Sequence, residues 1–172
     1  MSSVRTQVQT HVESNPGIHF SAIIDQLDIA TGQGQYHLHR LRKSGDVVAE
    51  EVRGQTHYFD PNYNDPWERR LLAFARRETA RALLLHLLAD TSVHAGELGD
   101  RLDLSRSTVA WHVSSLAEAG IIEKSYGERG QVVVSLTRPE ETRRLLGEVR
   151  PSLADRLVDR FTRLVDEGLG SQ

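Results

Sequence analysis

One stretch of the chain occurs twice and decides the fold. Residues 18–51 read IHFSAIIDQLDIATGQGQYHLHRLRKSGDVVAEE, and residues 93–126 read VHAGELGDRLDLSRSTVAWHVSSLAEAGIIEKSY. The two stretches align without a gap, and their identical pairs include His19 with His94. A similarity of this length that occurs only twice indicates a duplicated domain rather than a solenoid, which needs more repeats to bury its faces.

Each copy predicts two helices joined by a turn. Apolar residues at helical spacing mark both helices, and a polar turn lies between them. Thr31 or Ser105 is expected to cap the second helix at its N-terminus. Gly45 or Gly120 closes that helix at its C-terminus. The first helices of the two pairs are residues 20–27 and 95–102, and the turns are residues 28–32 and 103–107.

Two strand-like runs follow each second helix. A glycine-bearing turn joins the two runs, which predicts a β-hairpin. The runs are residues 46–52 with 55–59, and residues 121–125 with 131–136. A further helix is expected upstream of each copy, at residues 4–14 and 77–90. Helices, turn and hairpin in this order make a winged helix, so the predicted fold class is mainly α with small β-hairpin wings.

We expect four segments along the chain. Residues 1–64 and 90–138 form two winged helix-turn-helix domains, and residues 65–89 form one long connecting helix because they contain no strong helix breaker. Residues 139–172 form C-terminal helices separated by Pro151. The last helix carries an apolar stripe at helical spacing, made of Leu153, Leu157, Phe161, Leu164 and Val165. A partner helix would cover this stripe, so we predict a homodimer through the C-terminal helices.

The composition excludes several classes of protein. Of the 172 residues 38% are hydrophobic, which suits packed cores, and the absence of cysteine excludes disulfides, thiolate nucleophiles and cysteine zinc sites. The sequence has no glycine-rich phosphate loop, nucleophile elbow or metalloprotease helix, so we do not expect an enzyme. The longest apolar run, residues 82–89, is too short to span a bilayer, and we expect a soluble cytoplasmic protein.

The charge has to be judged locally. The chain has 21 basic and 24 acidic residues and a net charge of −3, whereas nucleic-acid-binding domains commonly have a basic excess. Lys43 and Lys124 are the only lysines, and this preference for arginine is typical of a GC-rich genome or a salt-loving host. Arginine suits phosphate and guanine because its donors form a planar fork. Basic residues crowd in the second helix of the first copy, at Arg40, Arg42 and Lys43.

The second helices of the two copies resemble those of a known family. Residues 34–45 and 105–120 are similar to the recognition-helix pattern of winged-helix regulators of the ArsR and MarR type, and more closely to the tandem winged-helix regulators of haloarchaea. The resemblance covers residues 15–136. It implies an archaeal transcriptional regulator, repressor or activator, that binds specific sequences of double-stranded DNA. Neither copy has the cysteine-bearing motif of metal-sensing ArsR proteins, so neither a metal nor a cofactor is expected.

The outward face of each recognition helix is the candidate DNA-binding surface. In the second copy Val109, Val113 and Leu116 define the buried face, and the opposite face follows from the helical period. In a helix-turn-helix this face enters the major groove, while wing tips reach phosphates or the minor groove. The candidate DNA-binding residues are Thr31, Gln33, Gln35, Tyr36, His39, Arg40, Lys43 and Arg53 in the first copy, and Arg106, Ser107, Thr108, Trp111, Ser114 and Arg129 in the second.

The eight histidines do not predict a metal site. His37 and His39 are the closest pair, but positions two apart on a helix diverge by about 200° and cannot bind one ion together. His19 recurs as His94, and His37 recurs in the second copy as His112. This recurrence predicts structural roles, such as hydrogen bonds between helices.

The sequence leaves three questions open, each with two alternatives. Tyr36 and Trp111 either contact DNA or pack at an interface between domains or protomers. The five arginines of residues 65–89 either contact phosphates or form a solvated face with intramolecular ion pairs. The two winged helices either bind DNA or serve as protein-protein interaction modules in transcription or chromosome machinery. Salt dependence separates the last two functions, because only phosphate contact releases counterions.

Overall fold

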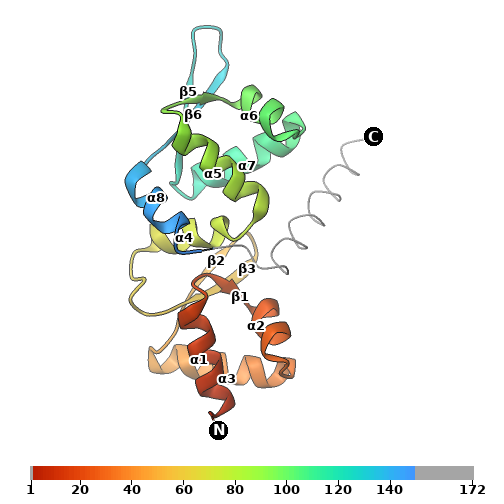
Figure 1. The fold of residues 1–172 in the computed structure, drawn as a ribbon, viewed down its shortest axis with the longest axis vertical. Helices are drawn as coiled ribbons and strands as arrows, with labels where there is room; N and C mark the ends of the chain where they lie inside the picture. Colours follow the sequence, from red (N-terminus) through yellow and green to blue (C-terminus); the bar gives the residue numbers. More distant parts are fainter. Residues whose placement is uncertain (1, 150–172) are drawn as a thin grey trace. The chain divides into compact units, whose positions relative to one another are not determined.

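The computed structural model describes residues 2–149 (Figure 1). The chain divides into two compact units, residues 1–73 and residues 74–172, and each unit contains one copy of the repeat. None of the described helices is long and apolar enough to cross a membrane.

The first unit combines three helices with a three-stranded antiparallel sheet. Its elements are α1 (Val4–Ser14), β1 (Ile18–His19), α2 (Phe20–Leu27), α3 (Thr31–Ser44), β2 (Val48–Val52) and β3 (Gln55–Phe59), and α4 (Pro66–Ala75) follows. The strand order is β1-β3-β2, and the hairpin pairs Val48 with Phe59 and Val52 with Gln55. The core of this unit is formed by fully buried apolar side chains, which include Val12, Ile23, Leu41 and Phe59.

The second unit repeats this architecture. Its elements are α5 (Glu78–Ala89), β4 (Val93–His94), α6 (Ala95–Leu102), α7 (Arg106–Glu118), β5 (Ile122–Tyr126), β6 (Val132–Leu136) and α8 (Pro139–Leu146). The strand order is β4-β6-β5, and the β5–β6 hairpin projects from the helices as a wing (Figure 1). The predicted fold class, mainly α with small β-hairpin wings and two helix-turn-helix units, is confirmed.

The two-residue strands β1 and β4 were not expected from the sequence. Ile18 pairs with Tyr58 of β3, and Val93 pairs with Val134 of β6. Two residues are too few to show the alternating pattern of a strand, so only the pairing in the folded chain reveals them. Each strand leads directly into the first helix of the helix-turn-helix.

The two helices of each helix-turn-helix cross closely, and the large residue at the crossing is on the first helix in one copy and on the second helix in the other. In the first unit Gly34 of α3 lies against Ile24 of α2, and a Cβ added at Gly34 would overlap the Ile24 Cδ1 atom. In the second unit the large and small residues are exchanged: Gly99 of α6 lies against Val109 of α7, 3.3 Å from a Cβ position to the Val109 Cγ2 atom. One large side chain fills the crossing in each case, which preserves packing without preserving residues.

The turns between the paired helices have the same backbone in both copies. Asp28 ends α2 with a φ of 50°, and Asp103 ends α6 with a φ of 55°, both in the left-handed region. Aspartate tolerates this region better than most residues with a side chain. Gly45, with a φ of 81°, and Gly120, with a φ of 76°, follow the recognition helices as predicted.

The single connecting helix predicted for residues 65–89 is wrong, because α4 ends at Ala75 and α5 begins at Glu78. Arg77 adopts an extended conformation with ψ 129°, and its backbone N–H donates to the Phe74 carbonyl at 3.0 Å. Residues 71–75 are buried without interruption, which a straight helix with one solvated face cannot achieve. The break between the two helices therefore results from tertiary packing and not from a glycine or a proline.

Two further expectations concern the helix ends. Thr31 is not the N-cap of α3: this position is taken by Ala30, whose side chain cannot accept a hydrogen bond. The predicted helix from Pro139 is present as α8, whereas the apolar stripe from Leu153 to Val165 and the homodimer inferred from it lie outside the described residues.

Candidate nucleic-acid interface

Helix α3 has one buried and one polar face. Leu38 and Leu41 point into the core, and Gly34 is buried against α2. The opposite face is exposed and carries the predicted contact residues Gln35, Tyr36, His39, Arg40 and Lys43, together with Arg42. Acidic residues are absent from positions 29–45, so this face is uniformly polar or cationic.

Arg40 and Tyr36 form a pair one helical turn apart. The Arg40 Nη1 atom donates to the Tyr36 hydroxyl at 3.1 Å, and its guanidinium carbon lies 5.6 Å from the centre of the ring. Tyr36 is 55% exposed, and its ring also meets His37 edge-on at 5.1 Å. The tyrosine thus orders the arginine while most of the guanidinium donors stay available.

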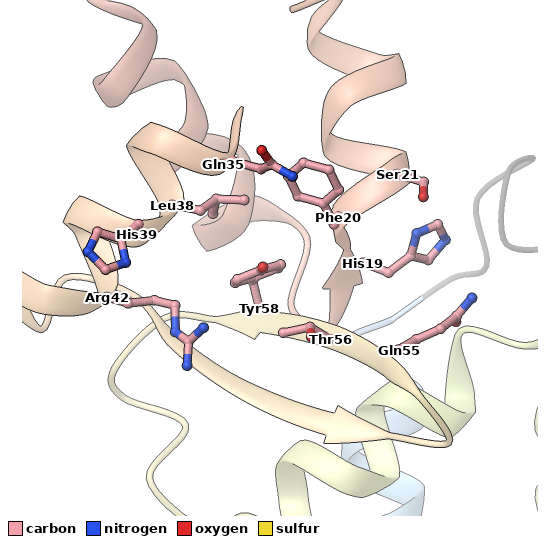
Figure 2. Close-up of a pocket in the computed structure, with 10 residues that line it drawn as sticks. All are labelled: His19, Phe20, Ser21, Gln35, Leu38, His39, Arg42, Gln55, Thr56 and Tyr58. Carbon is pink, nitrogen blue, oxygen red and sulfur yellow. The ribbon is translucent and has the colours of Figure 1, made fainter. Parts of the chain in front are cut away.

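A groove of about 410 Å³ runs beside α3 in the first unit (Figure 2). One wall is the outer part of α3, and the other is β3 with the start of α2. Arg42 and His39 lie at one end, His19 and Gln55 lie at the other, and Leu38 and Tyr58 lie between them (Figure 2). Ser21 and Thr56 add hydroxyl groups to the rim.

The side chains of this groove suit a phosphate backbone. The guanidinium of Arg42, the hydroxyls of Ser21 and Thr56 and the amide of Gln55 can all donate to phosphate oxygens. Burial raises the pKa of the Tyr58 phenol, and the charge of Arg42 lowers it in part. The phenol therefore stays protonated near neutral pH, so it adds no negative charge to the groove.

His19 has the structural role predicted for it. Its Nδ1 atom accepts a hydrogen bond from the Ala22 backbone N–H at 3.3 Å, which caps α2. His57 on β3 donates from Nδ1 to the Gly17 carbonyl at 2.7 Å and meets His19 edge-on at 6.3 Å. The counterpart His94 occupies the same cap position of α6 without a side-chain hydrogen bond to the helix.

The outer face of α7 is less charged. Arg106, Ser107 and Ser114 are exposed, and Trp111 is half-buried with its ring edge-on to His112 at 4.8 Å. Thr108 is a wrong assignment: it is 5% exposed, and its hydroxyl lies 2.8 Å from that of Ser105. Thr108 shares an inward side of α7 with His112 and Ser115, four and seven residues further on. Ser105 caps α7 as predicted and accepts from the Thr108 backbone N–H at 3.2 Å.

A second groove, of about 800 Å³, lies beside α7 in the second unit. It is bounded by the start of α6, by α7 and by β6, as the first groove is bounded by α2, α3 and β3. Arg106 and Ser114 line it from α7, and Lys124 lines it from β5. The Lys124 ammonium donates to the Ser114 hydroxyl at 3.3 Å.

Cations on the recognition helices and wings differ from many of those elsewhere in whether they pair with a carboxylate. Away from these surfaces arginines pair with carboxylates: Arg5 with Asp46 at 3.3 Å, Arg69 with Glu50 at 3.0 Å, Arg101 with Asp90 at 2.8 Å and Arg143 with Glu140 at 2.9 Å. Within residues 2–149, the recognition helices and the second wing carry cations that have no carboxylate partner, namely Arg40, Arg42, Lys43, Arg106, Lys124 and Arg129. Several acidic residues thus neutralise arginines on other parts of the surface.

The remaining predicted residues lie at the edges of this surface. Thr31 and Gln33 are in the exposed first turn of α3, where the Gln33 side chain accepts from the Ala30 backbone N–H at 3.2 Å. Arg53 and Arg129 are exposed in the turns of the two wings, and Arg53 has a φ of 53°.

Sequence reasoning missed the far wall of the first groove. Ser21, Gln55 and Thr56 are separated from α3 in the sequence, and only the pairing of β1 with β3 brings them opposite it. The sequence holds a weak signal for two of them: Ser21 lies in the first turn of a predicted helix, two residues after the repeated His19, and Gln55 recurs as Gln131 in the other groove.

The described residues offer no group of three histidine, cysteine, aspartate or glutamate side chains that could hold a metal ion. His37 and His39 lie on different sides of α3, with His37 half-buried and His39 exposed.

Comparisons with known proteins agree with the division into two units. A family model described as an N-terminal HTH domain matches residues 2–72, and one described as a helix-turn-helix domain matches residues 75–125. No curated protein matches the chain significantly in sequence.

Two solved structures give weaker likenesses. HlyU from Vibrio cholerae N16961 is 26% identical over 45% of this chain and 84% of its own, with a TM-score of 0.40. A structure of reduced AbfR bound to DNA is 17% identical over 87% of this chain and 95% of its own, with a TM-score of 0.39. Because both units match helix-turn-helix models and both carry a hairpin wing, the chain is a tandem winged helix-turn-helix protein of the kind found in DNA-binding transcription regulators.

Proposed function

We propose that the protein is a transcriptional regulator that binds specific sequences of double-stranded DNA through both domains. The recognition helices α3 and α7 enter the major groove, and the two wings contact the backbone or the minor groove. The observation that carries this proposal is the placement of six cations without carboxylate partners on those recognition helices and wings.

This placement supports DNA as the partner because unpaired cations are the groups that displace counterions from phosphates. A net charge of −3 does not oppose it, since several acidic side chains, such as Glu50, Asp90 and Glu140, pair with arginines outside the recognition helices and wing tips. Binding of phosphates depends on the charge of the surface that contacts them, and the net charge of the chain includes acidic residues that lie elsewhere.

The first domain supplies the side chains that read bases. Gln35 can pair with adenine, and Arg40 can pair with guanine through two parallel hydrogen bonds. Arg42, together with Ser21 and Gln55 across the groove, contacts the phosphate backbone and fixes the helix in register.

The test is a titration of the full chain with a random-sequence duplex at several salt concentrations, repeated with the site selected from a random pool. We expect log affinity to fall linearly with log salt and Arg42→Gln to flatten the slope by about one unit. Arg143→Gln is the matched control, because this exposed arginine of α8 pairs with Glu140. Equal effects of the two variants, or binding that ignores salt, would contradict the proposal and favour a protein-protein interaction module.

We also propose a homodimer through the C-terminal segment. The support is the helical spacing of Leu153, Leu157, Phe161 and Leu164 in the sequence, together with the match between twofold symmetry and palindromic sites. Light scattering compares the full chain with a chain truncated before Pro151. An unchanged mass per particle, corrected for the deletion, would remove this segment as the dimer seam.

A further inference from the structure

The grooves beside the two recognition helices are equivalent in position but unequal in size. Residues at matching positions of the repeat line both, including His19 with His94 and Leu38 with Val113. The groove of the second domain has about 800 Å³ and that of the first about 410 Å³. A volume of this size falls in the range of small-molecule sites, which is about 300–1,000 Å³.

The difference has a clear origin in α2 and α6. Phe20 occupies part of the space beside α3 in the first groove (Figure 2). Its ring lies 3.4 Å from a Cβ position at Gly34 on the facing helix. Its counterpart in the second domain is Ala95, and Ser21 is replaced by Gly96, where an added Cβ would meet open space. Val109, at the position of Gly34, returns part of this bulk from α7, but the second groove remains the larger one.

The lining of the second groove combines an apolar floor with cations at its ends. The floor consists of Ala95, Gly99, Leu104, Val109, Val113 and Val132. Arg106 lies at the first turn of α7, and Lys124 lies near Ser114, eight residues or about 12 Å further along the helix. Both are cations without a carboxylate partner in the described part of the chain, and Asp100 is the one acidic side chain of the lining.

We propose that the groove between α6, α7 and β6 binds a small amphipathic anion, with an aromatic or branched apolar body on the floor and its charged group on Arg106 or Lys124. The ligand would act as an effector. By the proposed function these two cations also face DNA, so an occupied groove weakens the contact of the second domain with DNA.

The first experiment measures ligand binding without DNA. The full chain is titrated with 8-anilinonaphthalene-1-sulfonate, whose fluorescence reports an apolar site, and with its uncharged relative N-phenyl-1-naphthylamine. We expect one sulfonate site per chain, and affinity for the uncharged probe lower by about tenfold. Equal affinity for both probes would overturn the anionic class of ligand.

Variants then locate the site. Ala95→Phe introduces the residue that narrows the first groove, and Ala110→Phe fills the second groove from the exposed side of α7. Each should lower the affinity for the sulfonate by at least about tenfold. Arg106→Gln tests the charge. Thermal unfolding of each variant shows that it is folded. Phe20→Ala, the converse change in the first domain, should leave the original site intact. Binding that survives both filling variants would overturn the proposed groove.

The second experiment tests the coupling. Saturating sulfonate should weaken the affinity of the wild-type chain for a DNA duplex severalfold, and it should leave the affinity of Ala95→Phe unchanged. If the probe binds as expected but DNA affinity does not move, the effector role is wrong while the site stands. If the chain does not bind DNA at all, the proposed function fails independently of the groove.

Discussion

The two domains share a backbone and differ in the surface that they offer. In the first domain α3 carries three cations and no acidic residue, and its groove is narrowed by Phe20. In the second domain α7 carries one cation, Arg106, and one acidic residue, Glu118, and its groove is wider. The elements that build the scaffold, such as the glycine after each recognition helix, are retained. The difference indicates that duplication preserved the fold while the charge and the grooves of the exposed faces diverged.

The buried faces show a second kind of divergence. Ile24 with Gly34, and Gly99 with Val109, place a large residue on opposite helices of the same crossing. The volume at the crossing is conserved although neither residue is. Paired exchanges of this kind keep the helix-turn-helix geometry constant while the outward residues change.

The largest expected effect concerns the charges. Changing Arg40, Arg42 and Lys43 together to glutamine removes three cations from α3 and should lower affinity for random DNA by about 100- to 1,000-fold near 0.1 M salt. The same change at Arg106, Lys124 and Arg129 should cost less, because these cations are spread over α7 and the wing. Titrations with DNA at several salt concentrations measure the loss of affinity in both triple variants.

A matched control uses Arg138, Arg143 and Arg144 of the second unit. All three pair with nearby glutamates, at 3.2, 2.9 and 3.4 Å. Their change to glutamine removes the same formal charge and should reduce affinity least. If all three triple variants lose affinity equally, net charge alone governs binding, and the distinction between paired and unpaired cations is meaningless.

The next effect concerns packing at the helix crossing. Gly34→Val should destabilise the first domain by about 1–3 kcal/mol, because its side chain overlaps Ile24. Adding Ile24→Ala should recover part of this loss, so that the pair resembles the second domain. Urea unfolding followed by Trp67 fluorescence in a Trp111→Phe background reports on the first unit.

Gly32→Val provides the control for that change. Gly32 lies on the same helix, and a Cβ added there meets nothing within 4 Å. The same substitution at this position should therefore leave the unfolding free energy nearly unchanged or raise it slightly, since valine is a better helix former than glycine. Equal losses at Gly32 and Gly34 would show that the crossing is not the cause.

The sequence predicts this fold well because the pattern of helices, turn and hairpin occurs twice, so each copy supports the assignment of the other. Helix α1 was predicted at its observed bounds, Val4–Ser14, and both hairpins were found from their runs and glycine turns. The break between α4 and α5 was not predicted, because no glycine or proline marks it. The five consecutive apolar residues at 71–75 are the local sign of burial on all sides there, which a solvated connecting helix would not have.

The candidate site was predicted only on one side. Helical periodicity identifies the exposed face of α3, because the period fixes which side chains point outward. It cannot identify Ser21 or Thr56, whose place opposite that face depends on strand pairing. Thr108 was misplaced because it lies four and seven residues before His112 and Ser115, with which it forms a buried side of α7.

A smaller effect compares the caps of the two recognition helices. Ser105 accepts from the Thr108 N–H at the start of α7, whereas Ala30 offers no acceptor at the start of α3. Ser105→Ala should therefore lower the unfolding free energy of the second domain by about 1 kcal/mol. Chemical unfolding followed by Trp111 fluorescence in a Trp67→Phe background measures it, and an unchanged midpoint would argue against a stabilising cap.

The smallest expected effect is the converse change, Ala30→Ser. Ala30 already has the extended backbone of a cap, with φ −67° and ψ 145°, and its N–H donates to the Gln33 side chain. A serine here would add the missing acceptor for the Gln33 N–H and complete a capping box with glutamine as its third residue after the cap. The gain should be about 0.5–1 kcal/mol, because one hydrogen bond of the box is already present. Urea unfolding followed by Trp67 fluorescence measures it. Ala30→Val, which has no acceptor, is the control, and an equal gain from valine would show that capping is not responsible.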